Sequence, residues 1–224
     1  MYFKNLRPGN TVSGEEIPCF INEETGEKFV YLMAGVHGDE VEGIYVLKKL
    51  FEWLKTSENI KVPLIVVPIL NIDGYKAGTR VNGSGVDLNR NLPSKHWSHE
   101  IREPKYNPGK APLSEPENKF LVNLLKKFAP KLILSFHSWK PMLNFNGNCK
   151  ETADFLSKYN GYPAVGEIED YPTPGSLGEY GPEVCGCGVL TWEMPLLSPE
   201  ITLKKIWEEN RLSLENLFNS PLLS

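Results

Sequence analysis

The sequence has no excess of positive charge and no long hydrophobic run. Lys and Arg number 24 against 28 Asp and Glu, so the formal net charge is −4. A chain with this balance lacks the basic surface on which nucleic-acid binding depends, so no nucleic-acid partner is expected. No apolar stretch reaches the roughly 20 residues that a helix needs to cross a bilayer, so no membrane span is expected either.

Cysteine is scarce, and the first residues lack the pattern of a secretory signal. Four cysteines in 224 residues do not make a disulfide scaffold. Cys185 and Cys187 could bind a metal as a pair, but no second pair lies nearby, so we expect them to be packed and reduced. Residues 1–10 lack the basic segment followed by an apolar one that marks a signal peptide. We therefore expect a soluble cytoplasmic protein.

The composition predicts one folded domain that spans residues 1–224. The chain is 41% hydrophobic, which is enough for a sizeable core. Its length exceeds the usual size of one domain by less than half, so one large domain is favoured over two. Glycine and proline number 19 and 18, which indicates many turns and a surface rich in loops.

Apolar runs alternate with segments of helical spacing along the chain. Strands are expected at 28–35, 62–70, 132–136 and 187–193, although Pro63 and Pro68 leave the ends of the second strand open. Helices are expected over 41–55, from a capping box at Ser114 and Glu117, and over 198–218 with Pro199 in the first turn. Between them, 71–112 shows no sustained period. This alternation predicts an α/β sheet with helices on both faces.

Polar residues with metal-ligand chemistry follow two of the predicted strands. His37 and Glu40 lie in the turn after 28–35, where an imidazole and a carboxylate can point at one spot. Zinc accepts both ligand types, although an isolated HxxE is more often a surface turn with a capping acid. His137 directly follows 132–136 and could be a third ligand or a packed histidine. His96 and His99 are a competing pair in the polar loop, but no predicted strand end positions them.

Two further groups would suit a substrate that has a carboxylate and a polarised carbonyl. Arg80 and Arg90 can grip a planar carboxylate or a developing oxyanion through their fixed fork of donors, although they could also pair with surface acids. Glu193 ends the strand at 187–193. If it is buried there, its pKa rises toward neutrality, which suits a general base; if it lies just past the strand, it is a solvated turn residue.

Six ordered motifs together resemble the zinc metallocarboxypeptidase family of the carboxypeptidase A type. They are HxxE at 37–40, GTR at 78–80, GVDLNRN at 85–91, SFH at 135–137, Tyr171, and WE at 192–193. The resemblance implies a mixed, mostly parallel twisted central sheet and one Zn²⁺ ion. It also implies a role for each matching residue. His37, Glu40 and His137 would be the zinc ligands, Asp87 would orient a zinc-bound histidine, and Glu193 would be the general base. Arg80 would polarise the scissile carbonyl, Asn89 and Arg90 would bind the substrate carboxylate, and Tyr171 would be a mobile residue that covers the bound substrate.

One branch of that family, the bacterial murein tripeptide amidases, is most similar. DYPTPGSLGEY at 170–180, LSEPE at 113–117 and DLNRNLP at 87–93 resemble it. The resemblance implies cytoplasmic hydrolysis of the bond between γ-D-glutamate and meso-diaminopimelate in the free cell-wall tripeptide, during peptidoglycan recycling. NIDG at 71–74 replaces the usual NPDG, and 138–148 has no match in the branch.

Three alternatives stay open. The chain could be a zinc deacylase of the aspartoacylase or succinylglutamate desuccinylase type, which shares HGxE and an Asn-Arg pair. It could be a metallocarboxypeptidase of different specificity, whose substrate is another small peptide with a free carboxylate. A zinc-containing binding protein with an inactive site is disfavoured, because each catalytic position holds a competent residue. The sequence does not reveal the oligomeric state.

Overall fold

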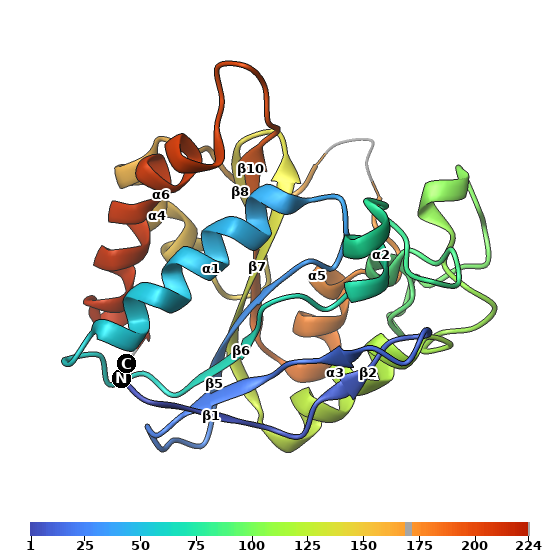
Figure 1. Cartoon of the computed structure of the whole chain (residues 1–224), viewed down its shortest axis with the longest axis horizontal. Helices are drawn as coiled ribbons and strands as arrows, with labels where there is room; N and C mark the ends of the chain where they lie inside the picture. The colour runs from blue at the N-terminus through green and yellow to red at the C-terminus, as the bar shows by residue number, and fades with distance from the viewer. Residues whose placement is uncertain (169–171, 224) are drawn as a thin grey trace.

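The computed structural model describes residues 1–168 and 172–223, which contain one large sheet and a two-stranded ribbon (Figure 1). The strands of the large sheet lie in the order β1 (Phe3–Asn5), β4 (Phe20–Asn22), β6 (Leu64–Val67), β5 (Phe29–Ala34), β7 (Pro130–Trp139), β10 (Gly188–Pro195), β8 (Met142–Asn146) and β9 (Ala164–Val165). The central strands β6, β5, β7 and β10 run parallel, whereas β4 and β8 lie antiparallel beside them. The expectation of a mixed, mostly parallel α/β sheet is confirmed.

Helices cover both faces of this sheet (Figure 1). α1 (Val41–Thr56), α4 (Lys150–Asn160) and α6 (Leu203–Phe218) pack on one face, and α3 (Pro116–Lys127) and α5 (Leu177–Tyr180) on the other. Successive side chains of β5 alternate between the two cores, so that Leu32 lies beneath α1 and Tyr31 beneath α3. All the side chains of β5 are therefore buried, which explains its continuous apolar sequence.

Shorter elements occupy the irregular parts of the chain. β2 (Gly9–Asn10) and β3 (Glu16–Ile17) form the ribbon, and 71–112 contains α2 (Ile72–Ala77) and the turns η1 (Leu88–Arg90) and η2 (Pro104–Tyr106). The turns η3 (Gly181–Cys185) and η4 (Pro221–Leu223) lie nearer the C-terminus. These elements are too short to produce a period in the sequence. None of the helices in the described ranges is both long and apolar enough to cross a membrane.

Two strand boundaries differ from the sequence prediction. β6 is shorter than 62–70 because Pro63 and Pro68, which cannot donate to a neighbouring strand, lie just outside its ends. β7 continues to Trp139, so His137 lies within a strand instead of following one. β7 pairs with β10 from Leu132 to Trp139, and this pairing accounts for the extension.

Two predicted helix starts were wrong. No capping box forms at Ser114: α3 begins at Pro116, and Glu115 has the extended conformation that a following proline imposes. α6 begins only at Leu203, where Thr202 accepts from the backbone N–H of Lys205, so Pro199 lies outside the helix. The elements that the sequence prediction did not contain include β8 and α4, in 138–160, and the edge strands β1, β4 and β9, which have only two or three residues each.

A buried polar group joins the layer of α4 and α6 to the sheet. Asn210 on α6 accepts from Trp192 Nε1 at 3.0 Å and donates to Tyr162 Oη at 3.1 Å. Its amide also donates to the carbonyl oxygen of Ile206 at 2.9 Å. The side chain of Asn210 is fully buried, and its Oδ1 atom is the acceptor for the buried indole N–H of Trp192, whereas Tyr162 Oη also bonds to Glu209.

Replacement of Asn210 by alanine is expected to lower the free energy of unfolding by about 2–4 kcal/mol, because it leaves the buried indole N–H of Trp192 without an acceptor. Urea unfolding followed by tryptophan fluorescence measures the change. Asn216→Ala on the same helix is the matched control, since the amide of Asn216 bonds only within the helix at the exposed surface. Equal stability of the two variants would contradict the role of Asn210.

Candidate active site

The turn between β5 and α1 holds an imidazole and a carboxylate in contact. His37 Nδ1 lies 2.7 Å from Glu40 Oε1, and the His37 side chain is almost completely buried. Gly38 permits this turn to lie against α2, because a Cβ atom there would come within 2.0 Å of the Gly74 carbonyl carbon. The HGDE sequence therefore folds as a tight, inward-facing turn, and the surface-turn alternative is wrong.

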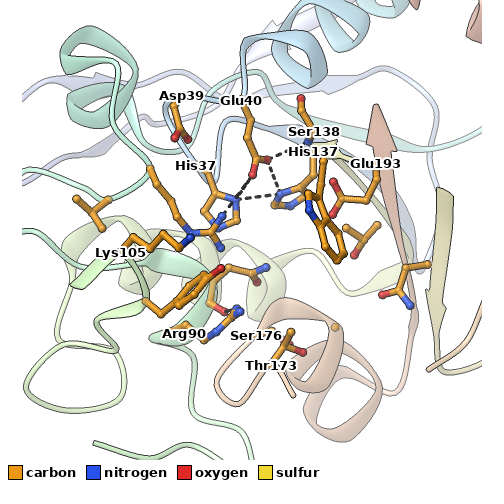
Figure 2. Close-up of a pocket in the computed structure, with 18 of the residues that line it drawn as sticks. His37, Asp39, Glu40, Arg90, Lys105, His137, Ser138, Thr173, Ser176 and Glu193 are labelled. Carbon is orange, nitrogen blue, oxygen red and sulfur yellow. Dashed lines mark hydrogen bonds and ion pairs between the residues drawn. The ribbon is translucent and has the colours of Figure 1, made fainter. Parts of the chain in front are cut away.

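His137 reaches the same point from β7. Its Nδ1 atom lies 2.8 Å from Glu40 Oε2 and 3.2 Å from His37 Nδ1 (Figure 2). One ligand atom from each of His37, Glu40 and His137 lies within 4.8 Å of the others. In the part of the chain that the structure describes, no other group of His, Cys, Asp and Glu side chains has this arrangement. The three residues can hold a metal ion.

The competing histidines lie elsewhere. His96 is exposed, with Nδ1 at 3.2 Å from Glu179 Oε1, and the ring of His99 packs against that of Trp97. Neither belongs to the His37, Glu40 and His137 group. The polar loop thus does not provide the metal ligands.

Each histidine of the group has a partner for its second ring nitrogen. His37 Nε2 lies 3.1 Å from Asp87 Oδ1, and His137 Nε2 lies 3.0 Å from Ser135 Oγ. Such contacts fix the orientation of a metal-binding imidazole. Asp87 was proposed for this purpose from the sequence, whereas Ser135 was missed. The sequence contains a signal for Ser135: side chains two residues apart on a strand point to the same face, so Ser135 and His137 lie on one face.

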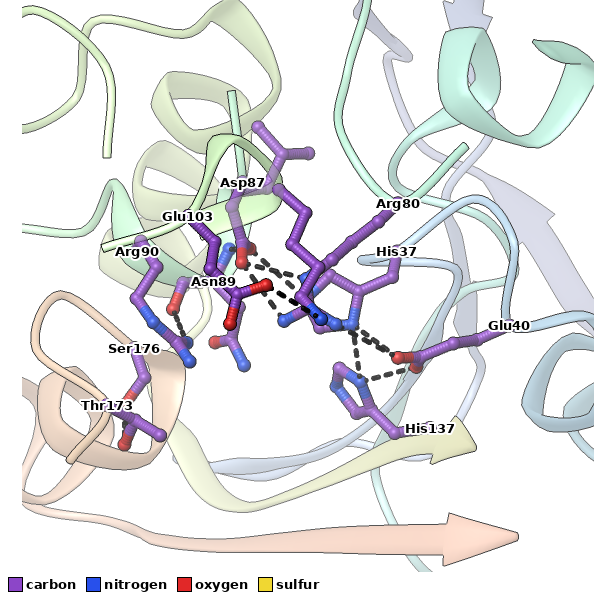
Figure 3. Close-up of polar contacts among 12 residues, drawn as sticks. His37, Glu40, Arg80, Asp87, Asn89, Arg90, Glu103, His137, Thr173 and Ser176 are labelled. Carbon is purple, nitrogen blue, oxygen red and sulfur yellow. Dashed lines mark hydrogen bonds and ion pairs between the residues drawn. The ribbon is translucent and has the colours of Figure 1, made fainter. Parts of the chain in front are cut away.

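Two arginines and an asparagine line the approach to this group (Figure 3). Both Nε and Nη2 of Arg80 lie 3.0 Å from Asp87 Oδ2. Asn89 accepts from the backbone N–H of Leu177 at 2.8 Å, so its amide nitrogen is the atom that can donate to a ligand. Arg90 donates to the carbonyl oxygen of Asn89 at 2.7 Å.

Tyr106 joins the two arginines and was missed from the sequence. Its ring lies 5.1 Å from Arg80 Cζ and 5.4 Å from Arg90 Cζ. These are cation–π distances, so the aromatic face supports both guanidinium groups. Nothing in the sequence marks Tyr106, because it lies in the irregular segment and contacts residues 16 and more positions away.

Glu193 lies beside His137 in the sheet. β7 and β10 run parallel, and Glu193 and His137 are partners in their register. Burial raises the pKa of Glu193 to about 8, with a further contribution from the negative charge of Glu40. Its Oε2 atom is buried and has no hydrogen-bond partner. Of the two alternatives from the sequence, the strand position is the one observed.

The charges of the group favour a cation at its centre. Burial raises the pKa of Glu40, but the two histidines outweigh this and hold it well below its ordinary value. Burial alone would lower the pKa of His37, yet Glu40 and Asp87 raise it to about 9, while burial lowers the pKa of His137. The carboxylates thus stabilise positive charge here, either as a proton on His37 or as a metal ion.

These residues line a cavity of about 840 Å³. Figure 2 shows His37, Glu40 and His137 on one side of it and Arg90, Thr173 and Ser176 on the other. Arg80, Asn89 and Glu193 also line it. Tyr171, expected to cover a bound substrate, lies outside the described residues.

Comparisons with known proteins match the segments of the chain that form this site. The catalytic-domain model of the succinylglutamate desuccinylase/aspartoacylase family matches residues 27–138. Murein peptide amidase A from Vibrio campbellii is 30% identical over 209 residues, which cover 88% of this chain and 82% of that protein. Both matches include the segments that carry His37, Glu40 and His137.

Solved structures show the same fold. The murein-tripeptide amidase MpaA from Escherichia coli O157 superimposes with a TM-score of 0.76 at 25% identity, over 96% of this chain and 92% of that one. Carboxypeptidase A from Helicoverpa armigera gives a TM-score of 0.77 at 15% identity, over 99% and 70% of the two chains. The chain therefore belongs to the metallocarboxypeptidase-type hydrolases, in the family of murein peptide amidase A, and its residues 27–138 belong to the succinylglutamate desuccinylase/aspartoacylase catalytic-domain family.

Proposed function

We propose that this chain is a zinc-dependent amidase that hydrolyses the γ-D-glutamyl–meso-diaminopimelate bond of L-Ala-γ-D-Glu-meso-diaminopimelate. The observation that carries the proposal is the position of Glu193. A buried carboxylate with an unpartnered oxygen lies beside His137, in a cavity that two arginines also line. This arrangement combines a general base, a cation site and a binding site for a carboxylate. Together they suit the hydrolysis of a peptide that ends in a carboxylate.

The donor set fits zinc. Two imidazole nitrogens and one carboxylate leave a fourth position for water or substrate, as in catalytic zinc sites. Ligand atoms at about 2.0–2.1 Å from a tetrahedral zinc lie about 3.3 Å from one another. The two Nδ1 atoms are 3.2 Å apart, which agrees with this spacing. When bound, zinc would act as a Lewis acid and lower the pKa of a water molecule to about 7.

Residues of this chain carry out the proton transfer and determine which bond of the peptide is cleaved. Glu193 takes a proton from the attacking water and passes it to the amine of the leaving diaminopimelate. Arg80 donates to the carbonyl oxygen of γ-D-glutamate as negative charge develops on it. Asn89 and Arg90 hold the carboxylate next to the leaving amine. Asp87 keeps His37 and Arg80 in place, and Tyr171 would cover the bound peptide.

One catalytic unit over residues 1–224 is part of the proposal. The large sheet joins β1 near the N-terminus to β10 near the C-terminus, which supports a single folding unit. The cytoplasmic location and the role in peptidoglycan recycling stay predictions from the resemblance.

A zinc deacylase is the second candidate, because the desuccinylase/aspartoacylase model matches half of the chain. That match ends at residue 138, before β8 and β10. The similarity to murein peptide amidase A extends over 88% of the chain. The amidase is therefore preferred.

The purified protein is expected to carry about one zinc ion per chain, and His37→Ala is expected to remove it, because two ligands cannot replace three at a catalytic zinc. Metal content by mass spectrometry measures this. His96→Ala is the matched control and should keep the zinc, since His96 lies at the exposed surface. If His96→Ala loses zinc and His37→Ala keeps it, the metal site lies in the polar loop that contains His96.

Glu193→Gln is expected to keep zinc and to lower kcat by at least about a hundredfold, because the amide cannot accept the proton from water. Steady-state kinetics and metal content on the same sample check both parts. Turnover near that of the parent protein would show that another group is the base.

Mass spectrometry of the products distinguishes the candidate reactions. The tripeptide L-Ala-γ-D-Glu-meso-diaminopimelate should yield free meso-diaminopimelate, and N-acetyl-aspartate and N-succinyl-glutamate should remain intact. Hydrolysis of an N-acyl amino acid with an untouched tripeptide would instead identify the deacylase. If the protein cleaves other peptides that end in a free carboxylate but not this tripeptide, it is a carboxypeptidase of different specificity.

A further inference from the structure

The segment that carries Asn89 and Arg90 is in contact with a turn from much later in the chain, at 172–176. The backbone N–H of Leu92 donates to the carbonyl oxygen of Gly175 at 2.9 Å. Gly175 has a φ of +74°, and a Cβ atom there would overlap with the carbonyl oxygen of Arg90. The 172–176 turn therefore packs directly on the backbone of Arg90, which glycine at position 175 permits.

The end of this turn sets the orientation of Asn89. The turn ends at Ser176, which caps α5, and the next residue, Leu177, donates its backbone N–H to Asn89 Oδ1 at 2.8 Å. Because Oδ1 is used in this contact, the amide nitrogen of Asn89 is left to donate to a ligand. Figure 3 shows Asn89, Arg90 and Ser176 on one side of the site, and all three line the cavity. The position of the 172–176 turn therefore decides how Asn89 is presented to a ligand.

Glu179 ties the turn to the segment that follows Arg90. Its Oε2 atom accepts from Ser94 Oγ at 2.5 Å and from the backbone N–H of Gly175 at 3.1 Å. The same N–H of Gly175 lies 3.0 Å from Ser94 Oγ, so the three groups form a closed set of hydrogen bonds. Hydrogen bonds to a carboxylate are stronger than those between neutral groups. Glu179 is thus well suited to keep the turn on the backbone of Arg90.

The carboxylate of Glu179 is used within the protein. Its second oxygen, Oε1, lies 3.2 Å from Nδ1 of the exposed His96. Glu179 is not among the described residues that line the cavity, although Gly178 beside it is. An effect of Glu179 on a bound substrate therefore has to pass through the 172–176 turn.

Glu183 makes a similar contact nearby and provides a comparison. Its Oε2 atom accepts from the backbone N–H of Lys95 at 2.9 Å, at the exposed surface. This contact also reaches the segment after Arg90, but it comes from η3 and involves neither Gly175 nor Leu177. Glu183 is therefore a control for the loss of a negative charge at this place.

We infer that Glu179 is a positioning residue for the binding of the substrate carboxylate. Through the 172–176 turn it fixes the carboxamide of Asn89 and the backbone of Arg90, the pair that would hold that carboxylate. The inference rests on the proposed function, which gives Asn89 and Arg90 this role.

Glu179→Ala is expected to raise KM for L-Ala-γ-D-Glu-meso-diaminopimelate about tenfold and to leave kcat within about twofold, because the lost hydrogen bonds lie outside the reacting groups. Glu179→Gln keeps an oxygen that can accept from Ser94 and Gly175, so its KM should stay within about threefold of the parent value. Glu183→Ala is the matched control and should leave KM unchanged. Steady-state kinetics at equal zinc content measures all three. If Glu179→Ala has the KM of Glu183→Ala, or loses kcat alone, the inference is wrong.

The substrate carboxylate gives a readout that a loss of stability would not change. In an analogue of the tripeptide, the carboxylate next to the scissile amide is replaced by a carboxamide. Glu179→Ala should reduce the preference for the tripeptide over this analogue, measured as the ratio of the two kcat/KM values, about tenfold. Ser94→Ala should reduce it by a smaller factor, because the N–H of Gly175 still bonds to Glu179. An unchanged preference in both variants would overturn the inference.

Hydrogen exchange of the Leu177 N–H tests the structural link without any substrate. This N–H is bonded to Asn89 Oδ1, so NMR should show slow exchange in the parent protein. Glu179→Ala should accelerate its exchange at least about tenfold, whereas the N–H groups of β5 should exchange as before. Equal exchange of Leu177 in both proteins would contradict the role of Glu179. If the parent protein leaves the tripeptide intact, the proposed function fails, and the exchange of Leu177 still decides whether Glu179 holds the turn.

Discussion

The parallel pairing of β5, β7 and β10 is the constraint on which the site depends. Parallel strands end at the same edge of a sheet, so the turn after β5 and the last residues of β7 and β10 meet there. His37 and Glu40 come from the turn, His137 from β7 and Glu193 from β10. A shift of one residue in the register of β10 would turn Glu193 to the opposite face, into the core beneath α1 and α6. Burial of both faces of the central strands prevents such a shift.

The buried carboxylates at this edge of the sheet need positively charged or hydrogen-bonding partners within the protein. Asp87 and Glu40 are buried or nearly so, and each lies next to a histidine and Arg80. An isolated carboxylate in this position would be strongly destabilising, whereas the paired network satisfies most of its hydrogen-bonding groups. Among the described residues that line the cavity, Glu193 Oε2 is the exception, because it is buried and unpartnered. A group left in that condition beside a cation site is typical of catalytic residues.

The two halves of the chain contribute different things to the cavity. Residues 27–138 supply the cation site and the arginines, and they are the part shared with the desuccinylase/aspartoacylase domain. Residues 142–193 supply Glu193, together with Asn144, Asn146 and Thr191, which also line the cavity. The segment matched by the family model thus carries the His37, Glu40 and His137 group, and the second segment lines the space beside it. Similarity over most of the chain is therefore more informative about substrate than similarity over the first half.

The sequence by itself determined the α/β class, the central strands and the local pairing of His37 with Glu40. These features depend on apolar runs and on residues three positions apart, so they are visible in a single segment. Local patterns left His137 in competition with His96 and His99; the resemblance implied that His137 joins the pair, and the tertiary structure shows that contact. Only the tertiary structure decided that Tyr106 lies against Arg80 and Arg90. It also decided the pairing of Asn144 with Thr191. Each of these contacts joins residues far apart in the chain, and strand register and loop path, which no local pattern encodes, bring them together.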